Sequence, residues 1–316
     1  MTTTISSTMS ARVWFLLILL SMLWGGSFFF VGVAVGELPA LTITFLRVSI
    51  AAIALWSFAF AIGIRPNLSR QVWLAFFGMG MLNNVIPFVL IVWGQTQIAS
   101  GLASILNAAT PIFAVIVAGL LLPDEKPTPL KIIGVMIGFT GVVVMIGVPA
   151  LGGTGTLLAQ LAIVGATVSY AFAGVFGRRF KTMKINPIIV AAGQVTASSI
   201  VMLPMTLYVD GVIGVGEVNT PVWASVFALA ILSTAVAYVL YFKILEVAGA
   251  TNVLLVTLLV PVSAVFLGTV FLGESLDVIH IVGMLLIALG LSAIDGRLWQ
   301  GVNHINRDEK SNSPKN

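Results

Sequence analysis

The chain is divided into ten apolar stretches, each close to the roughly 20 residues that an α-helix needs to cross a bilayer. They are longer than the ~9–11-residue strands of membrane β-barrels. The loops between them are short. We therefore expect an all-α integral membrane protein with ten transmembrane helices. The stretches run approximately over Val13–Val35, Leu41–Ile62, Val72–Val92, Ile98–Leu121, Leu130–Val148, Thr156–Phe176, Pro187–Val209, Val222–Phe242, Asn252–Leu272 and Val278–Ile294.

The composition agrees with this class of protein. Hydrophobic residues make up 59% of the chain and charged residues only 8%, whereas soluble domains carry roughly 25% charged residues. Because the chain has 0 cysteines, it contains no disulfide framework and no thiol chemistry. The net charge of +4 would suit a nucleic-acid-binding protein, but the positions of the basic residues follow membrane topology. The expected partner is the lipid bilayer and not nucleic acid.

The basic residues lie on one side of the membrane when the N-terminus is placed in the cytoplasm. The outer loops then hold only acidic charges, at Glu37, Asp210, Glu217, Glu274 and Asp277. The cytoplasmic ends hold Arg12, Arg65, Arg70, Lys126, Lys131, Arg178, Arg179, Lys181, Lys184, Lys243, Arg297, Arg307, Lys310 and Lys315. We therefore expect a multi-pass membrane protein with both termini in the cytoplasm. The polar tail over 297–316 is expected to be disordered.

Two parts of the chain repeat each other. Residues 83–90 align with residues 233–240, and the same offset brings Pro111 onto Pro261. After one residue is dropped from the next loop, the further matches are Glu125 with Glu274, Thr128 with Asp277, Gly134 with Gly283, Gly141 with Gly290 and Gly147 with Gly296. Because these residues control backbone geometry or charge, we interpret the matches as a duplication. It divides the chain into repeats over 12–148 and 156–296.

Each repeat holds five spans, an odd number, so the second copy is inserted upside down relative to the first. Glu125 then ends a helix at the cytoplasmic side, while Glu274 ends one at the outer side. Inverted repeats of this kind build alternating-access transporters, in which the substrate site lies near the midplane between the copies. The pattern therefore predicts a secondary transporter of a small molecule.

Several motifs in order give the chain a resemblance to a known family. They are Trp24-Gly25-Gly26-Ser27, Pro39 followed by Phe45-Leu46-Arg47, Asn107 to Pro111, and Gly273-Glu274 followed by Gly283 and Gly290. In this order and spacing, from Arg12 to Gly296, the chain resembles the ten-helix EamA-type branch of the drug/metabolite transporter superfamily. The resemblance implies two five-helix halves, export or exchange of small metabolites, and a location in the bacterial inner membrane. The substrates of the family range from amino acids to nucleobases and drugs, so the resemblance does not choose among them; we expect small organic metabolites such as amino acids or related compounds. It departs at Pro123-Asp124-Glu125-Lys126, where a Gly-Glu turn is usual.

Three prolines in the spans are candidate helix breaks: Pro87, Pro111 and Pro261. A proline inside a helix donates no backbone hydrogen bond, and its ring clashes with the carbonyl four residues earlier. For the paired prolines 111 and 261, the freed carbonyls belong to Asn107 and Thr257. In lipid such a carbonyl needs a partner or a water-lined cavity. We expect these breaks to face the substrate cavity.

Arg47 is the one full charge well inside a span. An ionisable residue there is costly and usually faces the interior of the bundle. In one arrangement, which is the preferred interpretation, it reaches an outer acid or loop carbonyls and locks the outer end. In the other it faces the cavity and binds a carboxylate of the substrate.

The other candidate substrate-binding residues are uncharged polar or aromatic side chains within the spans. The alternative role for each polar one is interhelical hydrogen bonding, which contributes ~0.6 kcal/mol per pair in membranes. Tryptophan and tyrosine also serve as interface anchors. The candidates are Trp24, Ser27, Asn83, Asn84, Asn107, Tyr170, Thr234, Tyr238 and Thr257.

Other function classes have less support. We find no metal-ligand cluster, catalytic grouping or phosphate-binding loop, so neither an enzyme nor a cofactor is expected. No acidic residue lies near the middle of a span, and Glu125 and Glu274 are interpreted as turn or helix-cap residues. A passive channel or facilitator and a non-transporting membrane sensor stay as alternatives. The Gly134/Gly138 pair is compatible with close helix packing or with dimerisation, so the chain is expected to be a monomer or a homodimer.

The charge asymmetry makes a prediction about topology. In a chain without native cysteines, a cysteine introduced at Gly153 should react with an impermeant thiol reagent added to intact cells. A cysteine at Ser311 should stay unlabelled, because the tail is expected to be cytoplasmic. The reverse labelling pattern would contradict the predicted orientation.

Overall fold

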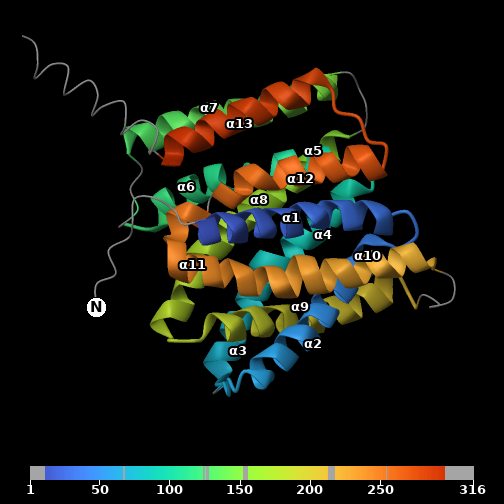
Figure 1. Cartoon of the computed structure of the whole chain (residues 1–316), viewed down its shortest axis with the longest axis vertical. Coiled ribbons are helices and arrows are strands. Elements are labelled where there is room, and N and C mark those ends of the chain that lie inside the picture. Colours follow the sequence, from blue (N-terminus) through green and yellow to red (C-terminus); the bar gives the residue numbers. More distant parts are fainter. Residues whose placement is uncertain are drawn as a thin grey trace, which may run out of the picture.

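The computed structural model describes residues 11–66, 68–123, 125, 128–151, 156–212, 218–253 and 255–295, and within these ranges every regular element is a helix (Figure 1). The α-helices are α1 (Ala11–Ala34), α2 (Ala40–Ala61), α3 (Arg70–Gly80), α4 (Ile86–Gln95), α5 (Ser100–Asn107), α6 (Thr110–Leu121), α7 (Pro129–Leu151), α8 (Leu157–Thr182), α9 (Pro187–Val209), α10 (Thr220–Ala230), α11 (Ala237–Val253), α12 (Leu255–Phe271) and α13 (Val278–Asp295). Two π-helices, η1 (Met81–Val85) and η3 (Ile231–Val236), connect α3 to α4 and α10 to α11.

These elements form the ten predicted spans. By length and composition, 7 helical segments are able to cross a membrane, and the shorter apolar helices Pro129–Val144, Leu259–Phe271 and Val278–Ile294 complete the set. The third and eighth spans each consist of two α-helices joined by a π-helix, and the fourth consists of α5 and α6. The prediction of an all-α membrane protein with ten spans is confirmed.

The two ends of the bundle differ in charge. One end, which we call the acidic end, carries Glu37, Asp210, Glu274 and Asp277 and lies on the right in Figure 1. The opposite, basic end carries Arg12, Arg65, Arg70, Lys131, Arg178, Arg179, Lys181, Lys184 and Lys243. The predicted contributions of Lys126, Glu217, the 152–153 loop and the tail over 297–316 lie outside the described residues.

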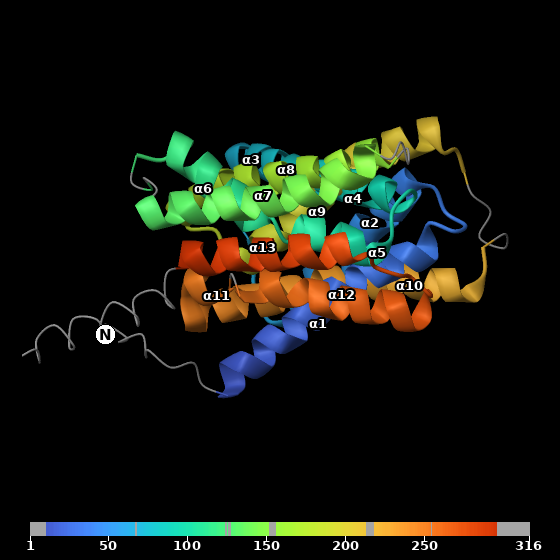
Figure 2. The same ribbon diagram turned by 90° about the horizontal axis from the view of Figure 1, so that it is seen from above.

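Helix packing follows the repeat. The corresponding helices α7 and α13 pack on each other at one edge of the bundle, as do α2 and α9 at the other (Figure 1). The first helix of each repeat packs against the opposite half: α1 contacts α10, α11 and α12, while α8 contacts α4, α5 and α6. Figure 2 shows α1 beside α11 and α12. This exchange of equivalent contacts is the arrangement expected for two inverted five-helix repeats.

Glycine brings α7 and α13 into close contact. A Cβ atom added to Gly134 would lie 2.6 Å from the backbone oxygen of Gly290, and one added to Gly141 would lie 2.8 Å from that of Gly283. Lipid gives no hydrophobic drive for helix association, so close van der Waals packing over small residues stabilises such pairs. The Gly134/Gly138 motif thus mediates contact between two helices of the same chain.

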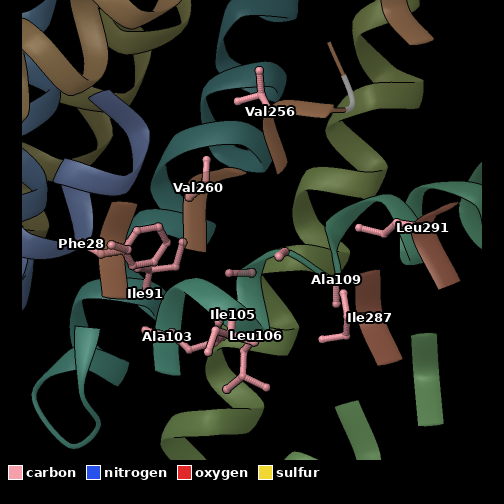
Figure 3. Packing of buried hydrophobic residues seen from close by; sticks show 14 of the residues in the cluster. Phe28, Ile91, Ala103, Ile105, Leu106, Ala109, Val256, Val260, Ile287 and Leu291 are labelled. Carbon is pink, nitrogen blue, oxygen red and sulfur yellow. The ribbon is translucent and has the colours of Figure 1, made fainter. Parts of the chain in front are cut away.

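A shared apolar cluster joins the two halves near the middle of the bundle (Figure 3). It contains Phe28 of α1, Ile105 of α5, Val260 of α12 and Ile287 of α13, all with less than a tenth of their surface exposed. Because side chains from both repeats interdigitate here, the halves form one packed body.

We predict that Gly134→Ala destabilises the protein by about 1–3 kcal/mol, since the new methyl group meets backbone that cannot move aside. Gly174→Ala in α8 is the matched control, because nothing lies within 4 Å of a Cβ atom added there. Melting temperatures in detergent check both variants. An unchanged melting temperature for Gly134→Ala would contradict the close α7–α13 contact.

Candidate functional site

The two π-helices lie at equivalent places in the repeats. η1 begins at Met81 and η3 at Ile231, which is the offset at which the two halves align. A π turn inserts an extra residue into a helix and is frequent at functional sites. Both turns carry the small polar pair that marks the repeat, Asn83-Asn84 in η1 and Ser233-Thr234 in η3.

Local chemistry accounts for these turns. Pro87 lies at the start of α4, where it has no N–H to donate and its ring disfavours an ordinary turn against the Asn83 carbonyl. Ala237 occupies this place in the second half. There the hydroxyl of Thr234 donates to the carbonyl of Leu229, five residues earlier, at 2.9 Å. In η1 the Leu82 carbonyl accepts from a hydroxyl of another helix, Ser169, at 2.6 Å.

Each half also places a side chain on the π-helix of the other half. Arg47 of α2 donates from Nε to Thr234 Oγ1 in η3 at 2.9 Å. Gln194 of α9 accepts through Oε1 from Asn83 Nδ2 in η1 at 3.1 Å. Arg47 and Gln194 are both seven residues past the start of their helices. They thus occupy similar places in the corresponding helices α2 and α9, but one is charged and the other is a neutral amide.

A hydrogen-bond network continues from η1 into the second half. Tyr238 accepts from Asn83 Nδ2 at 3.1 Å and donates its hydroxyl proton to Asn84 Oδ1 at 2.9 Å. Asn84, which has no exposed surface, donates from Nδ2 to Ser198 Oγ at 3.2 Å. The structure therefore brings Arg47, Asn83, Asn84, Thr234 and Tyr238 together around the two π-helices.

The Arg47 guanidinium is buried at the centre of this group. Its side chain is 6% exposed, and its Cζ lies 3.7 Å from the centroid of the Phe88 ring. A cation over an aromatic face is stabilised by the ring quadrupole. Within the described part of the chain, Nε alone among the guanidinium nitrogens has a hydrogen-bond acceptor. The two Nη nitrogens of a buried cation, which carry four N–H donors, are therefore left for another partner.

The described outer acids do not supply that partner. Glu37 binds Asn219, Asp210 binds Thr42, and Glu274 binds the N-terminus of α5. The expected pairing of Arg47 with an acid is thus not found among the described residues, because these three carboxylates are held at the acidic end by nearer N–H or O–H donors, and Asp277 forms no ion pair with Arg47 either. Glu217 lies outside the described residues. The bond from Nε to Thr234 is nevertheless a structural contact between the halves.

Aromatic side chains surround the cation. Tyr170 and Tyr238 are close enough to interact with its charge, and Tyr170 packs against apolar clusters on two sides. Trp24 lies farther along the bundle, with its ring 5.7 Å from that of Tyr241. The group thus combines one cation, several amide and hydroxyl groups and aromatic faces, which suits a small amphipathic molecule with an anionic group.

Three predicted residues lie apart from this group. The Ser27 hydroxyl donates to the Trp24 carbonyl within α1 at 2.6 Å. Asn107 ends α5, and its buried Oδ1 has no partner within the described residues. Thr257 is half-buried in α12.

The paired prolines behave differently. Next to Pro111 the span is interrupted between α5 and α6, and the carbonyl of Asn107 accepts from the Thr110 hydroxyl at 2.7 Å. The Thr110 hydroxyl thus supplies the partner that this carbonyl needs, and the expectation that the break faces the substrate cavity stays a prediction. At Pro261 the expected interruption is absent, because α12 continues through it. The residue before it, Val260, has no hydroxyl that could satisfy a broken turn.

Sequence reasoning left three residues out of the site. Phe88 under the guanidinium gave no signal beyond its place in the repeated apolar run. Gln194 and Ser198 are one helical turn apart on α9, and this i, i+4 spacing of polar residues in an apolar span was the available signal.

Two segments of the chain match one known protein family. The EamA-like transporter family matches residues 12–147 and again residues 157–294. The chain belongs to the EamA-like transporter family.

Its relatives agree with this assignment. An Archaeoglobus fulgidus uncharacterized transporter is 28% identical over 280 residues, covering 89% of this chain and 97% of that protein. The Bacillus subtilis uncharacterized transporter YoaV is 25% identical, covering 87% and 94%. The Escherichia coli K12 uncharacterized inner membrane transporter YedA is also 25% identical, covering 83% of both. A crystal structure with 19% identity and a TM-score of 0.64, covering 90% and 97%, shares the fold. This EamA chain is therefore a multi-pass membrane transporter.

We predict that Tyr238→Phe lowers stability by about 0.6 kcal/mol, and by up to ~1.7 kcal/mol, the range measured for buried hydrogen bonds in membranes. The change removes the hydroxyl that joins Asn83 and Asn84. Tyr208→Phe is the control, because Tyr208 is 92% exposed. Chemical or thermal denaturation in detergent measures both. Equal stability of the two variants would argue against the network.

Proposed function

We propose that this EamA transporter is a secondary carrier that exports or exchanges small organic metabolites bearing a carboxylate, such as amino acids or related compounds. It works by alternating access between the two inverted halves, in the cell inner membrane with both termini in the cytoplasm. The membrane assignment is supported by the printed name of the Escherichia coli relative. The orientation is supported by the separation of basic and acidic ends. The carrier is a monomer or a homodimer.

The observation that carries the substrate proposal is the state of Arg47. Its Nε is held by Thr234 and its face by Phe88, so the guanidinium is oriented before substrate arrives. The two remaining nitrogens have no acceptor in the described part of the chain. A planar guanidinium with two adjacent free donors matches the two oxygens of a carboxylate.

The neighbouring groups suit the rest of such a molecule. Tyr170, Tyr238 and Phe88 offer aromatic surface for an apolar side chain. The amides of Asn83 and Gln194 lie on the same network and supply donors and acceptors for an amino or hydroxyl group. In the equivalent position of the second half, Gln194 carries no charge. The substrate is therefore expected to bind in a single orientation, with its carboxylate facing Arg47 on α2.

Accumulation of solute in proteoliposomes separates a carrier from a facilitator or a sensor. A purified carrier should drive a labelled amino acid or related carboxylate above its external concentration when counter-substrate is present inside. Equilibration without accumulation would favour the facilitator, and binding without flux would favour the sensor.

We predict that Arg47→Lys raises the apparent Km for a carboxylate substrate at least tenfold, which corresponds to ~1.4 kcal/mol. Lysine keeps the charge but loses the planar fork that binds a carboxylate with two bonds. The melting temperature should fall only by the amount expected for one interhelical hydrogen bond, because the Nε bond to Thr234 is lost while the charge stays over Phe88. Arg70→Lys, at the exposed start of α3, is the matched control. A lower melting temperature with unchanged Km would assign Arg47 a purely structural role.

A further inference from the structure

Glu274 ties the two halves together at the acidic end. Its Oε1 accepts from the backbone N–H of Ser100 at 2.7 Å, and its Oε2 accepts from that of Gly101 at 3.0 Å. These are the first two residues of α5, whose N–H groups have no partner within the helix. A carboxylate at a helix N-terminus is further stabilised by the helix dipole. Glu274 therefore caps a helix of the opposite repeat.

Other contacts close the same end. Asp210 Oδ2 accepts from both the backbone N–H and the hydroxyl of Thr42, at 2.8 and 2.7 Å. Glu37 accepts from the backbone and side-chain N–H groups of Asn219, at 2.8 and 2.7 Å. These two donors lower the pKa of the Glu37 carboxyl. Each contact joins the first half to the second, so the two halves are tied together at the acidic end.

The basic end lacks the equivalent cap among the described residues. Glu125 corresponds to Glu274, and each glutamate follows a glycine by six residues, Gly119 and Gly268. Glu125 bonds instead to Arg178, with 3.4 Å between Oε1 and Nη1 and both side chains about half exposed.

The backbone that would receive Glu125 is inside a helix. At the repeat offset, Ser100 and Gly101 correspond to Ala250 and Thr251. In the first half a loop separates α4 from α5, whereas α11 continues through these positions to Val253. The N–H groups of 250 and 251 are thus engaged within α11 and are not free at a helix start.

We propose that Glu125 and Glu274 are alternating latches of the transport cycle. In the conformation seen here, Glu274 closes the acidic end on α5. In the opposite conformation the last part of α11 unwinds, Glu125 caps the N–H groups of 250 and 251, and Glu274 leaves α5. The proposal rests on the alternating access proposed above.

The exchange keeps the two states similar in energy, because one carboxylate gains two backbone donors as the other loses two. The N–H groups of 250 and 251 give up their place inside α11 and take the Glu125 carboxylate as acceptor in return. The Glu125–Arg178 pair is half-exposed, and such pairs contribute little stability, so its loss is no obstacle. Gly249, directly before the 250–251 pair, is a poor helix former and favours unwinding there.

Gly268 provides a second way to disturb the latch. A Cβ atom added at this position would meet the Glu274 carboxylate at Oε2. Gly268→Ala should therefore displace the carboxylate from α5 while keeping its charge. Glu274→Gln does the opposite, because it keeps the shape of the side chain and removes the charge.

The test uses a single reporter cysteine in this naturally cysteine-free chain. Ser104→Cys places it on α5, one turn beyond the latch, where the native side chain is fully buried. The full-length protein is reconstituted in liposomes, and an impermeant maleimide is added from the side of the acidic end. Glu274→Gln and Gly268→Ala should each raise the labelling rate roughly tenfold, the effect expected for losing a charged hydrogen bond. Glu125→Gln should lower it.

Glu246→Gln is the matched control, because this exposed glutamate pairs only with Lys243 on its own helix in the described structure, and it should leave labelling unchanged. Unchanged labelling in Glu274→Gln and Gly268→Ala, or a rise in Glu125→Gln, would overturn the latch. Glu125→Gln alters the far end of the bundle, so it tests the proposal even where the acidic-end variants fold poorly. Equal labelling from both faces in every variant would instead overturn alternating access itself.

Discussion

The structure depends on one constraint, which is that backbone N–H and C=O groups inside a bilayer must be satisfied by the protein. Every irregular stretch of the described spans meets this condition with a hydroxyl. Ser169 donates to the Leu82 carbonyl, Thr234 to that of Leu229 and Thr110 to that of Asn107. Ser169 comes from a neighbouring helix, whereas Thr234 and Thr110 bind carbonyls of their own spans. The polar side chains that a substrate needs are gathered at the same places.

Much of the fold could be predicted from the sequence for the same reason. Bilayer thickness sets the length of each apolar stretch, so the ten spans could be predicted, most of them to within a few residues. The exceptions are α8, which runs to Thr182 past the predicted end at Phe176, and α11, which runs to Val253 past the predicted end at Phe242. Glycines such as Gly134 and Gly290 kept the repeat visible, because a side chain there would collide with backbone of the facing helix. Helix contact geometry requires glycine at these positions, whereas one apolar residue can replace another at the positions between them.

The site was harder to predict. A π turn adds one residue without changing hydropathy, and only the first of the two is accompanied by a proline. Pro111 and Pro261 align in sequence, but Thr110 satisfies an interrupted turn and Val260 does not. Arg47 was expected to need an acid, yet a hydroxyl and an aromatic ring hold it in the described structure. Such contacts between distant segments follow from packing, and no local pattern encodes them. An alignment of the second spans of the two repeats from their helix starts would have placed Arg47 opposite Gln194 and so indicated this pair.

The difference between Arg47 and Gln194 bears on two requirements of a transporter, which are motion between two states and recognition of one substrate. In the proposed carrier, motion between two states of similar energy needs equivalent contacts in both halves. The matched π-helices and glycines lie at equivalent places in the structure, and the glutamates become equivalent only in the proposed latch. Recognition of one substrate needs the opposite, because a symmetric site would bind a molecule equally in two orientations. The helices α2 and α9 are equivalent in the scaffold and pack on each other, but only α2 carries a charge within its membrane span. The duplicated backbone can thus support alternation while a single arginine, set against a glutamine, directs the ligand.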